Sequence, residues 1–228
     1  MTSTLNRMET LLQQMLGRSD GRAFFLRCYA LMTKNMLEAV ETGQFADPEW
    51  MRRFIDHFAT YYFAGLDQYE RDIANAPKVW VQAHDIAKRD SCAILQKVLL
   101  GINAHINFDL ALTVADLLEN EWAGLGEDQR AKRFADYCHV NEIIAGTIDE
   151  VQDQVIEPHS ESMKWLDTVL GRVDEWLLSR LIRSWRDEIW DQALAILEAP
   201  NRESRFLITL DLEASALGRG ESILIFKK

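Results

Sequence analysis

One helical segment carries a histidine and an aspartate at a spacing that could perform acid–base chemistry. The segment, residues 101–110, reads GINAHINFDL. His105 and Asp109 are four residues apart, so a helix that turns about 100° per residue projects both side chains in the same direction. Ile102 and Ile106 flank this pair on one side and Phe108 on the other, which predicts that it faces the interior.

A buried histidine and carboxylate need compensation, because an unpaired ionised group in an apolar setting costs several kcal/mol. Three arrangements supply it. The two groups can join a hydrogen-bond network, they can ligate a metal, or His105 can act as a general base that Asp109 orients. Gly101, in the middle of the same helix, predicts close approach by another helix or a ligand.

The helix expected over residues 127–157 supplies a second pair of inward polar residues. On its helical projection Asp136 and Asn141 fall within the apolar arc, whereas Glu142 falls on the polar face and His139 at the edge. We therefore expect His139 and Glu142 to form a solvated pair. The predicted catalytic set is His105 and Asp109 with Asp136 and Asn141.

Four further residues are candidates for substrate binding. Tyr61 and Tyr62 bring hydroxyl groups from an aromatic helix, and His84 lies at the edge of an apolar arc. Arg183 lies among tryptophans near the C-terminus. Its head can reach solvent, pair with Asp109 or Asp136, or hold a carboxylate or phosphate of a small ligand.

A metal site can be built from the same residues. His105, Asp109 and Asp136 offer one imidazole and two carboxylates, which suits a single divalent ion such as Zn or Fe/Mn if water or His84 completes the coordination. The metal is one alternative, beside acid–base chemistry without a metal and a purely structural network.

Apolar residues recur at three- and four-residue spacings through nearly the whole chain, which predicts an all-α fold. With no linker or internal repeat, residues 1–228 are expected to form one multi-helix bundle with long central helices. The predicted helices cover residues 3–16, 20–42, 48–75, 78–89, 91–121, 127–157, 161–171, 173–198 and 201–217. Residues 222–226, SILIF, are the one strand-like run and predict a short extended tail.

Composition narrows the function classes. The 228 residues carry a formal charge of −11, so a broad surface for nucleic acid or an anionic membrane is not expected. No window is expected to approach the roughly 20 uncharged apolar residues of a membrane span, and the N-terminus does not read as a signal peptide. The 3 cysteines show no CxxC pairing. These features favour a reducing, cytoplasmic location and a small-molecule partner, and they leave a homo-oligomer open.

The GxNAHINxDL helix, together with the downstream Asp136 and Val140-Asn141, resembles the signature of a mainly bacterial family of unknown function. That resemblance implies an all-helical, single-domain protein and brings no reaction with it. The His-x-x-x-Asp helix is also similar to an element of zinc-dependent phospholipases C, although this chain has only 5 histidines where those enzymes use several His-rich helices.

Three functions remain open from the sequence. The chain could be an enzyme that acts on a small molecule inside the bundle, by acid–base or metal-assisted chemistry. It could instead bind a ligand or partner without catalysis, or use His105, Asp109, Asp136 and Asn141 as a structural network that fixes helix register. Inward polar residues near the middle of two separate helices favour the enzyme slightly.

Overall fold

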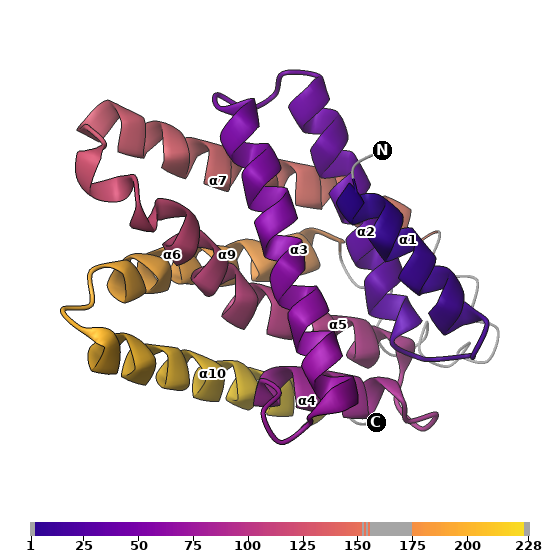
Figure 1. The fold of residues 1–228 in the computed structure, drawn as a ribbon. Coiled ribbons are helices and arrows are strands. Elements are labelled where there is room, and N and C mark those ends of the chain that lie inside the picture. Colours follow the sequence, from indigo (N-terminus) through magenta and orange to yellow (C-terminus); the bar gives the residue numbers. More distant parts are fainter. Residues whose placement is uncertain (1–2, 152, 154, 156–174, 226–228) are drawn as a thin grey trace.

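The computed structural model describes residues 3–151, 153, 155 and 175–225, and in this part of the chain all regular structure is helical. This confirms the predicted all-α, multi-helix fold (Figure 1). The predicted helix over residues 161–171 lies outside the described residues. The helices are α1 (Ser3–Leu16), α2 (Ala23–Glu41), α3 (Pro48–Arg71), α4 (Lys78–Ala87), α5 (Ile94–Ala104), η1 (His105–Asp109), α6 (Leu110–Glu119), η2 (Trp122–Gly124), α7 (Glu127–Val151), α9 (Glu175–Leu197) and α10 (Arg202–Ile225).

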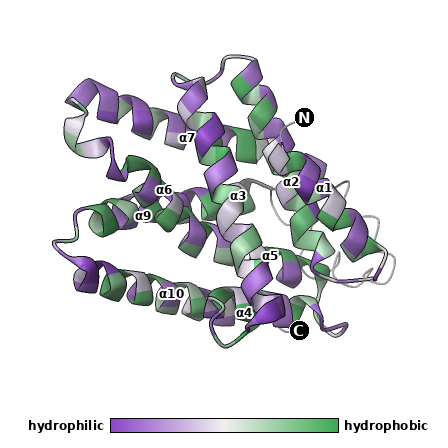
Figure 2. Cartoon of the chain, in the orientation of Figure 1, coloured by the Kyte–Doolittle hydropathy of each residue, from purple (hydrophilic) through white to green (hydrophobic). Residues whose placement is uncertain are grey.

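The segment Ile94–Glu119 forms the centre of the bundle. It consists of α5, the π-helical turn η1 and α6, and helices α2, α3, α9 and α10 pack against its different sides. Figure 1 shows α3 crossing this segment and α9 lying beside α10. In Figure 2 the surrounding helices carry both hydrophobic and hydrophilic residues, as expected for helices with one buried face.

The central segment is also long and apolar enough to cross a membrane, judged by length and composition alone. Of its most apolar window, 83% is buried inside the fold. Burial on several sides by other helices accounts for this composition, because a helix covered all round needs apolar residues all round.

Local sequence signals explain where the helices begin and end. Gly43 follows α2 with a φ of +73°, a left-handed conformation that glycine adopts without steric cost. Asp47 caps α3 by accepting a hydrogen bond from the Trp50 backbone N–H, and Pro48 occupies the first helical position. These boundaries match the predicted ones.

Close packing around α5 is confirmed at Gly101. A Cβ at this position would lie 2.4 Å from ring atoms of Phe25 on α2, so only glycine allows this approach. On the opposite side Asn103 donates to the Ala216 carbonyl of α10 at 2.8 Å, and Asn107 donates to the Asn103 side chain at 2.9 Å. The central segment is therefore covered on most of its circumference.

The predicted extended tail is wrong. Helix α10 continues to Ile225, and Ile223 and Leu224 pack against the core. Gly220 lies on the buried side of the same helix. The apolar residues 223–225 resemble a strand only in isolation, because together with the earlier turns of α10 they continue a helix. The last residue of the predicted tail, 226, lies outside the described residues.

Candidate functional site

His105 and Asp109 form a buried hydrogen-bonded pair, as their spacing predicts. His105 Nδ1 lies 3.0 Å from Asp109 Oδ2, and only 4% of His105 and 1% of Asp109 are exposed. Trp80 of α4 donates its indole N–H to both carboxyl oxygens, at 3.1 and 3.0 Å. Both residues of the pair belong to η1, and π-helical turns are frequent at functional sites.

Aromatic rings hold the His105 imidazole in place. Phe58 of α3 stacks on it with centroids 3.6 Å apart and an interplanar angle of 7°, and Tyr29 of α2 packs edge-on at 4.3 Å. His105 Nε2 is buried and has no hydrogen-bond partner among the described residues. The ring is therefore fixed on one side by Asp109, and its second nitrogen is left without a protein partner.

Burial sets the protonation of this pair. It lowers the pKa of His105 well below the usual range and raises the pKa of the Asp109 carboxyl well above it, against the opposing effect of the Trp80 hydrogen bond. Both shifts favour uncharged groups. In that state the carboxylic acid donates to Nδ1, so the ring proton lies on Nε2, which becomes a hydrogen-bond donor.

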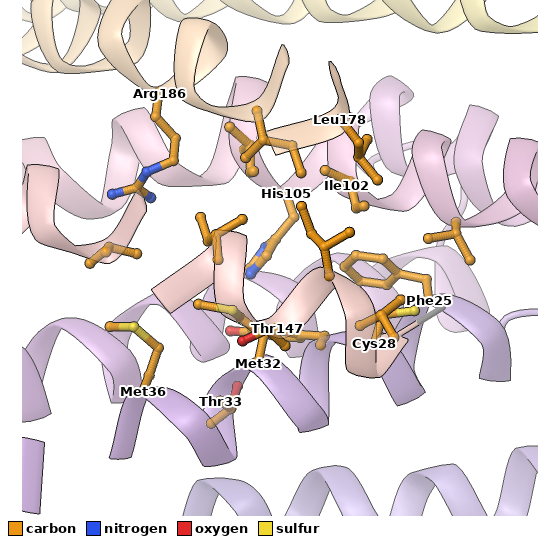
Figure 3. A pocket seen from close by; sticks show the side chains of 18 of the residues that line it. Phe25, Cys28, Met32, Thr33, Met36, Ile102, His105, Thr147, Leu178 and Arg186 are labelled. Carbon is orange, nitrogen blue, oxygen red and sulfur yellow. The ribbon is translucent and has the colours of Figure 1, made fainter. Parts of the chain in front are cut away.

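An apolar cavity of about 160 Å³ adjoins this histidine. Side chains of α2, α3, α5, α7 and α9 line it, and His105 and Arg186 belong to its wall (Figure 3). Cys28 also lines the cavity, but burial raises the pKa of its thiol to about 12, which keeps it protonated. Most of the remaining lining is aliphatic, aromatic or methionine.

Asn141 is buried, as its inward projection predicts, but it does not itself line the cavity. Its Oδ1 accepts a hydrogen bond from Arg186 Nε at 2.8 Å, whereas Arg183, the predicted anchor, is exposed. Arg186 is 2% exposed. A signal for it exists in the sequence, since apolar residues that face the core precede it by four positions and follow it by three and four: Ile182, Ile189 and Trp190.

Asp136 is buried as predicted but does not join His105. Its two carboxylate oxygens accept the backbone N–H groups of Ala46 and Asp47, at 2.7 and 2.8 Å, so it fixes the loop that precedes α3. Among the described residues no three His, Cys, Asp or Glu side chains lie together as a metal-binding group. The predicted metal set of His105, Asp109 and Asp136 is thus not assembled, and we derive no chemistry through a metal.

Tyr61 belongs to a network at the surface. Its hydroxyl donates to Asp116 at 2.6 Å, and His57 and Arg205 contact the same carboxylate at 3.1 Å each. The predicted pair of His139 and Glu142 also forms, with 3.2 Å between Nδ1 and Oε2. Neither Tyr61 nor this pair lines the cavity.

Tyr62 and His84 lie deep in the core around Trp80. They line a separate small cavity of about 10 Å³. His84 stacks on Trp80 and contacts Tyr69, with centroid distances of 5.1 and 4.8 Å. The Tyr62 hydroxyl and His84 Nε2 have no hydrogen-bond partner in the described part of the chain. The cavity beside His105 does not include either residue.

His84 predicts a loss of stability in acid. Burial, followed by the positive charges of Arg22 and Lys88, lowers its pKa to about 3, whereas an unfolded chain binds this proton below a pH of about 6.5. The stability from neutral His84 is therefore present at pH 7 and is lost as the pH falls from about 6.5 toward 3. Between pH 7 and pH 5, protonation of His84 in the unfolded chain should lower the free energy of unfolding by about 2 kcal/mol.

Urea unfolding of the wild type and His84→Leu at both pH values measures this effect. The variant should lose about 2 kcal/mol less than the wild type between pH 7 and pH 5. An equal loss in both proteins would show that His84 is protonated in the folded state.

A helical bundle that places a buried His–Asp pair beside an apolar cavity is the class of protein that the fold and the site define. The chain belongs to the family of unknown function DUF5995, whose model matches residues 1–224. The predicted membership in a family of unknown function is thereby confirmed. No curated protein and no solved structure matches the chain. The similarity to zinc-dependent phospholipases C stays a prediction.

Proposed function

We propose that the chain binds a small, largely apolar molecule in the cavity, with His105 as a hydrogen-bonding contact. One observation carries the proposal: the cavity in the middle of the bundle has a buried histidine in its wall whose Nε2 lacks a partner among the described residues. Buried polar atoms are nearly always satisfied, so each exception needs an explanation. A bound molecule supplies the missing acceptor.

The cavity volume indicates the size of the ligand body that it can hold. An engineered cavity of about 150 Å³ in another protein, lined by Leu, Ile and Phe, stays dry and binds benzene or xenon. The cavity here, at about 160 Å³, has a comparable volume and a largely apolar lining. It suits a molecule with a body of about one aromatic ring or a short branched chain.

Toluene provides the simplest test of binding. At a free concentration ten times its Kd, it should stabilise the folded protein by about 1.4 kcal/mol, which raises the Tm by about 3 to 6 °C for a chain of this length. Scanning calorimetry at several toluene concentrations measures this rise. An unchanged Tm at saturation would overturn the proposal.

Two variants show where toluene binds. Ile102 of α5 lines the cavity (Figure 3), so Ile102→Phe should fill part of the space and remove most of the rise in Tm. Ile73 is 52% exposed and lies outside the lining, so Ile73→Phe makes the same chemical change without touching the cavity and should retain the rise. Equal responses in the two variants would place toluene elsewhere.

Acid–base catalysis is the second candidate function, favoured by the 3.0 Å hydrogen bond between His105 and Asp109 inside a π-helical turn. A carboxyl group that orients an imidazole is a common arrangement for proton transfer. The test is to incubate each molecule that binds with the wild type and with His105→Gln and to compare the products by mass spectrometry. A product formed only by the wild type supports catalysis; recovery of every ligand unchanged contradicts it.

A further inference from the structure

Arg186 is a buried cation without a carboxylate partner in the described part of the chain. Nε donates to Asn141 at 2.8 Å, one Nη2 hydrogen goes to the Tyr137 carbonyl at 2.7 Å, and the guanidinium lies over the Tyr137 ring at 4.3 Å. A guanidinium has five N–H donors. These contacts occupy two of them, and no described residue accepts from Nη1.

Two other arginines with buried or half-buried side chains have carboxylate partners. Arg22 pairs with Asp20 and Glu70, and Arg133 pairs with Asp47 and Glu121. No described acid lies within 4.0 Å of the Arg186 guanidinium, although Arg186 is buried at least as deeply as Arg22. Charged side chains are rarely buried completely unless they are paired.

The position of Arg186 indicates where its partner would come from. Its side chain lines the same cavity as His105 (Figure 3). His105 Nε2 has no partner among the described residues, and the hydrogen bonds of the Arg186 side chain come from Nε and Nη2 and leave Nη1 without a described acceptor. The rest of the wall is largely apolar. An anion with an apolar body would satisfy the guanidinium and fill the cavity at the same time.

We infer that the cavity selects a small monocarboxylate, with its carboxylate on Arg186 and its apolar body among the aliphatic and aromatic side chains. This inference rests on the proposed function, since it names the chemical class of the ligand. The planar guanidinium fork matches a carboxylate better than any neutral group, and such charge-assisted hydrogen bonds are the strong ones. One carboxylate is expected, because Arg186 is the one described cationic side chain, taking arginine and lysine together, in the lining.

Benzoate and benzamide test the inference on the wild-type protein. They have nearly the same shape and differ in charge, and their single ring matches the cavity volume. Isothermal titration calorimetry should show benzoate binding about 10- to 100-fold more tightly than benzamide, the range expected for a buried charge-assisted contact. Equal affinities would overturn the inference.

Asn141→Asp is the sharpest variant. It places a carboxylate next to Arg186 Nε with almost no change in shape and satisfies the guanidinium from within the chain. The preference for benzoate over benzamide should fall at least tenfold, while the affinity for benzamide should stay within about twofold. Arg186→Gln should abolish the preference for benzoate over benzamide. It replaces Asn141→Asp in this test if that variant does not fold. A preference that survives both substitutions would overturn the inference.

The results separate the two proposals. If toluene binds in the cavity but benzoate binds no better than benzamide, the cavity is a ligand site and the carboxylate preference is wrong. If toluene, benzoate and benzamide all fail to bind, both proposals are wrong.

Discussion

Replacing Asp109 by alanine is expected to lower the free energy of unfolding by about 3 to 5 kcal/mol. The carboxyl group is the acceptor for the Trp80 indole N–H and the partner of His105 Nδ1, and both contacts are buried. Each polar atom left unsatisfied in the interior costs about 1–3 kcal/mol, and the space vacated by the side chain adds to this loss. Urea unfolding at neutral pH measures the change.

Asp109→Asn is the matched control. If the pair is uncharged, the amide oxygen can accept from Trp80 while the amide N–H₂ donates to His105 Nδ1, as the carboxylic acid does in the wild type. The loss should then be about 1 kcal/mol or less. If Asp109→Asn lowers the free energy of unfolding as much as Asp109→Ala does, the aspartate is ionised in the wild type. If neither variant lowers it measurably, the hydrogen bonds of Asp109 to His105 and Trp80 do not stabilise the fold.

Gly101→Ala is expected to lower the free energy of unfolding by about 1 to 2 kcal/mol. The new Cβ would lie 2.4 Å from ring atoms of Phe25, whose ring is itself in contact with Tyr62, Trp80 and His105. Overpacking of this kind typically costs about 1–3 kcal/mol, and the helix propensity of alanine offsets only part of it. The same urea experiment measures this loss.

Gly146→Ala makes the same change in a helix where nothing opposes it. In the described part of the chain, and apart from the neighbouring backbone of α7 itself, no atom lies within 4 Å of a Cβ at Gly146, which is exposed. Alanine should raise the free energy of unfolding there by about 0.5–1 kcal/mol, because glycine loses more conformational freedom in a helix. If both substitutions raised the free energy of unfolding, that result would contradict the close contact between Gly101 of α5 and Phe25 of α2.

The sequence predicts those parts of the fold and site that depend on local spacing. The helices follow from three- and four-residue repeats, and the His105–Asp109 contact follows from one helical turn. The inward faces of Asp136 and Asn141 follow from projection of a single helix, and both residues are buried. Gly101 signals a close approach because glycine is otherwise unfavourable inside a helix.

The partners of these residues lie far away in the chain, and spacing does not reveal them. Asp136 binds backbone groups 89 and 90 positions earlier, and Asn141 binds Arg186, 45 positions later. Arg183 and Arg186 are about one helical turn apart. A small error in predicting which face of α9 is buried is therefore enough to select the exposed Arg183 in place of the buried Arg186. Nor does a single helix indicate that five helices leave a cavity between them.

The π-helical turn η1 accommodates one extra residue in the central segment. Leu110 N–H bonds to the His105 carbonyl, five residues back instead of four, so this turn holds one residue more than an α-helical turn. That residue is taken up within the turn, so α5 and α6 keep nearly the orientation that they would have in one continuous α-helix. A one-residue deletion within α5 or α6 would instead rotate the following residues by about 100° and turn their buried face away from its neighbours. Within the central segment, η1 is therefore the place where a change of length by one residue disturbs the flanking helices least.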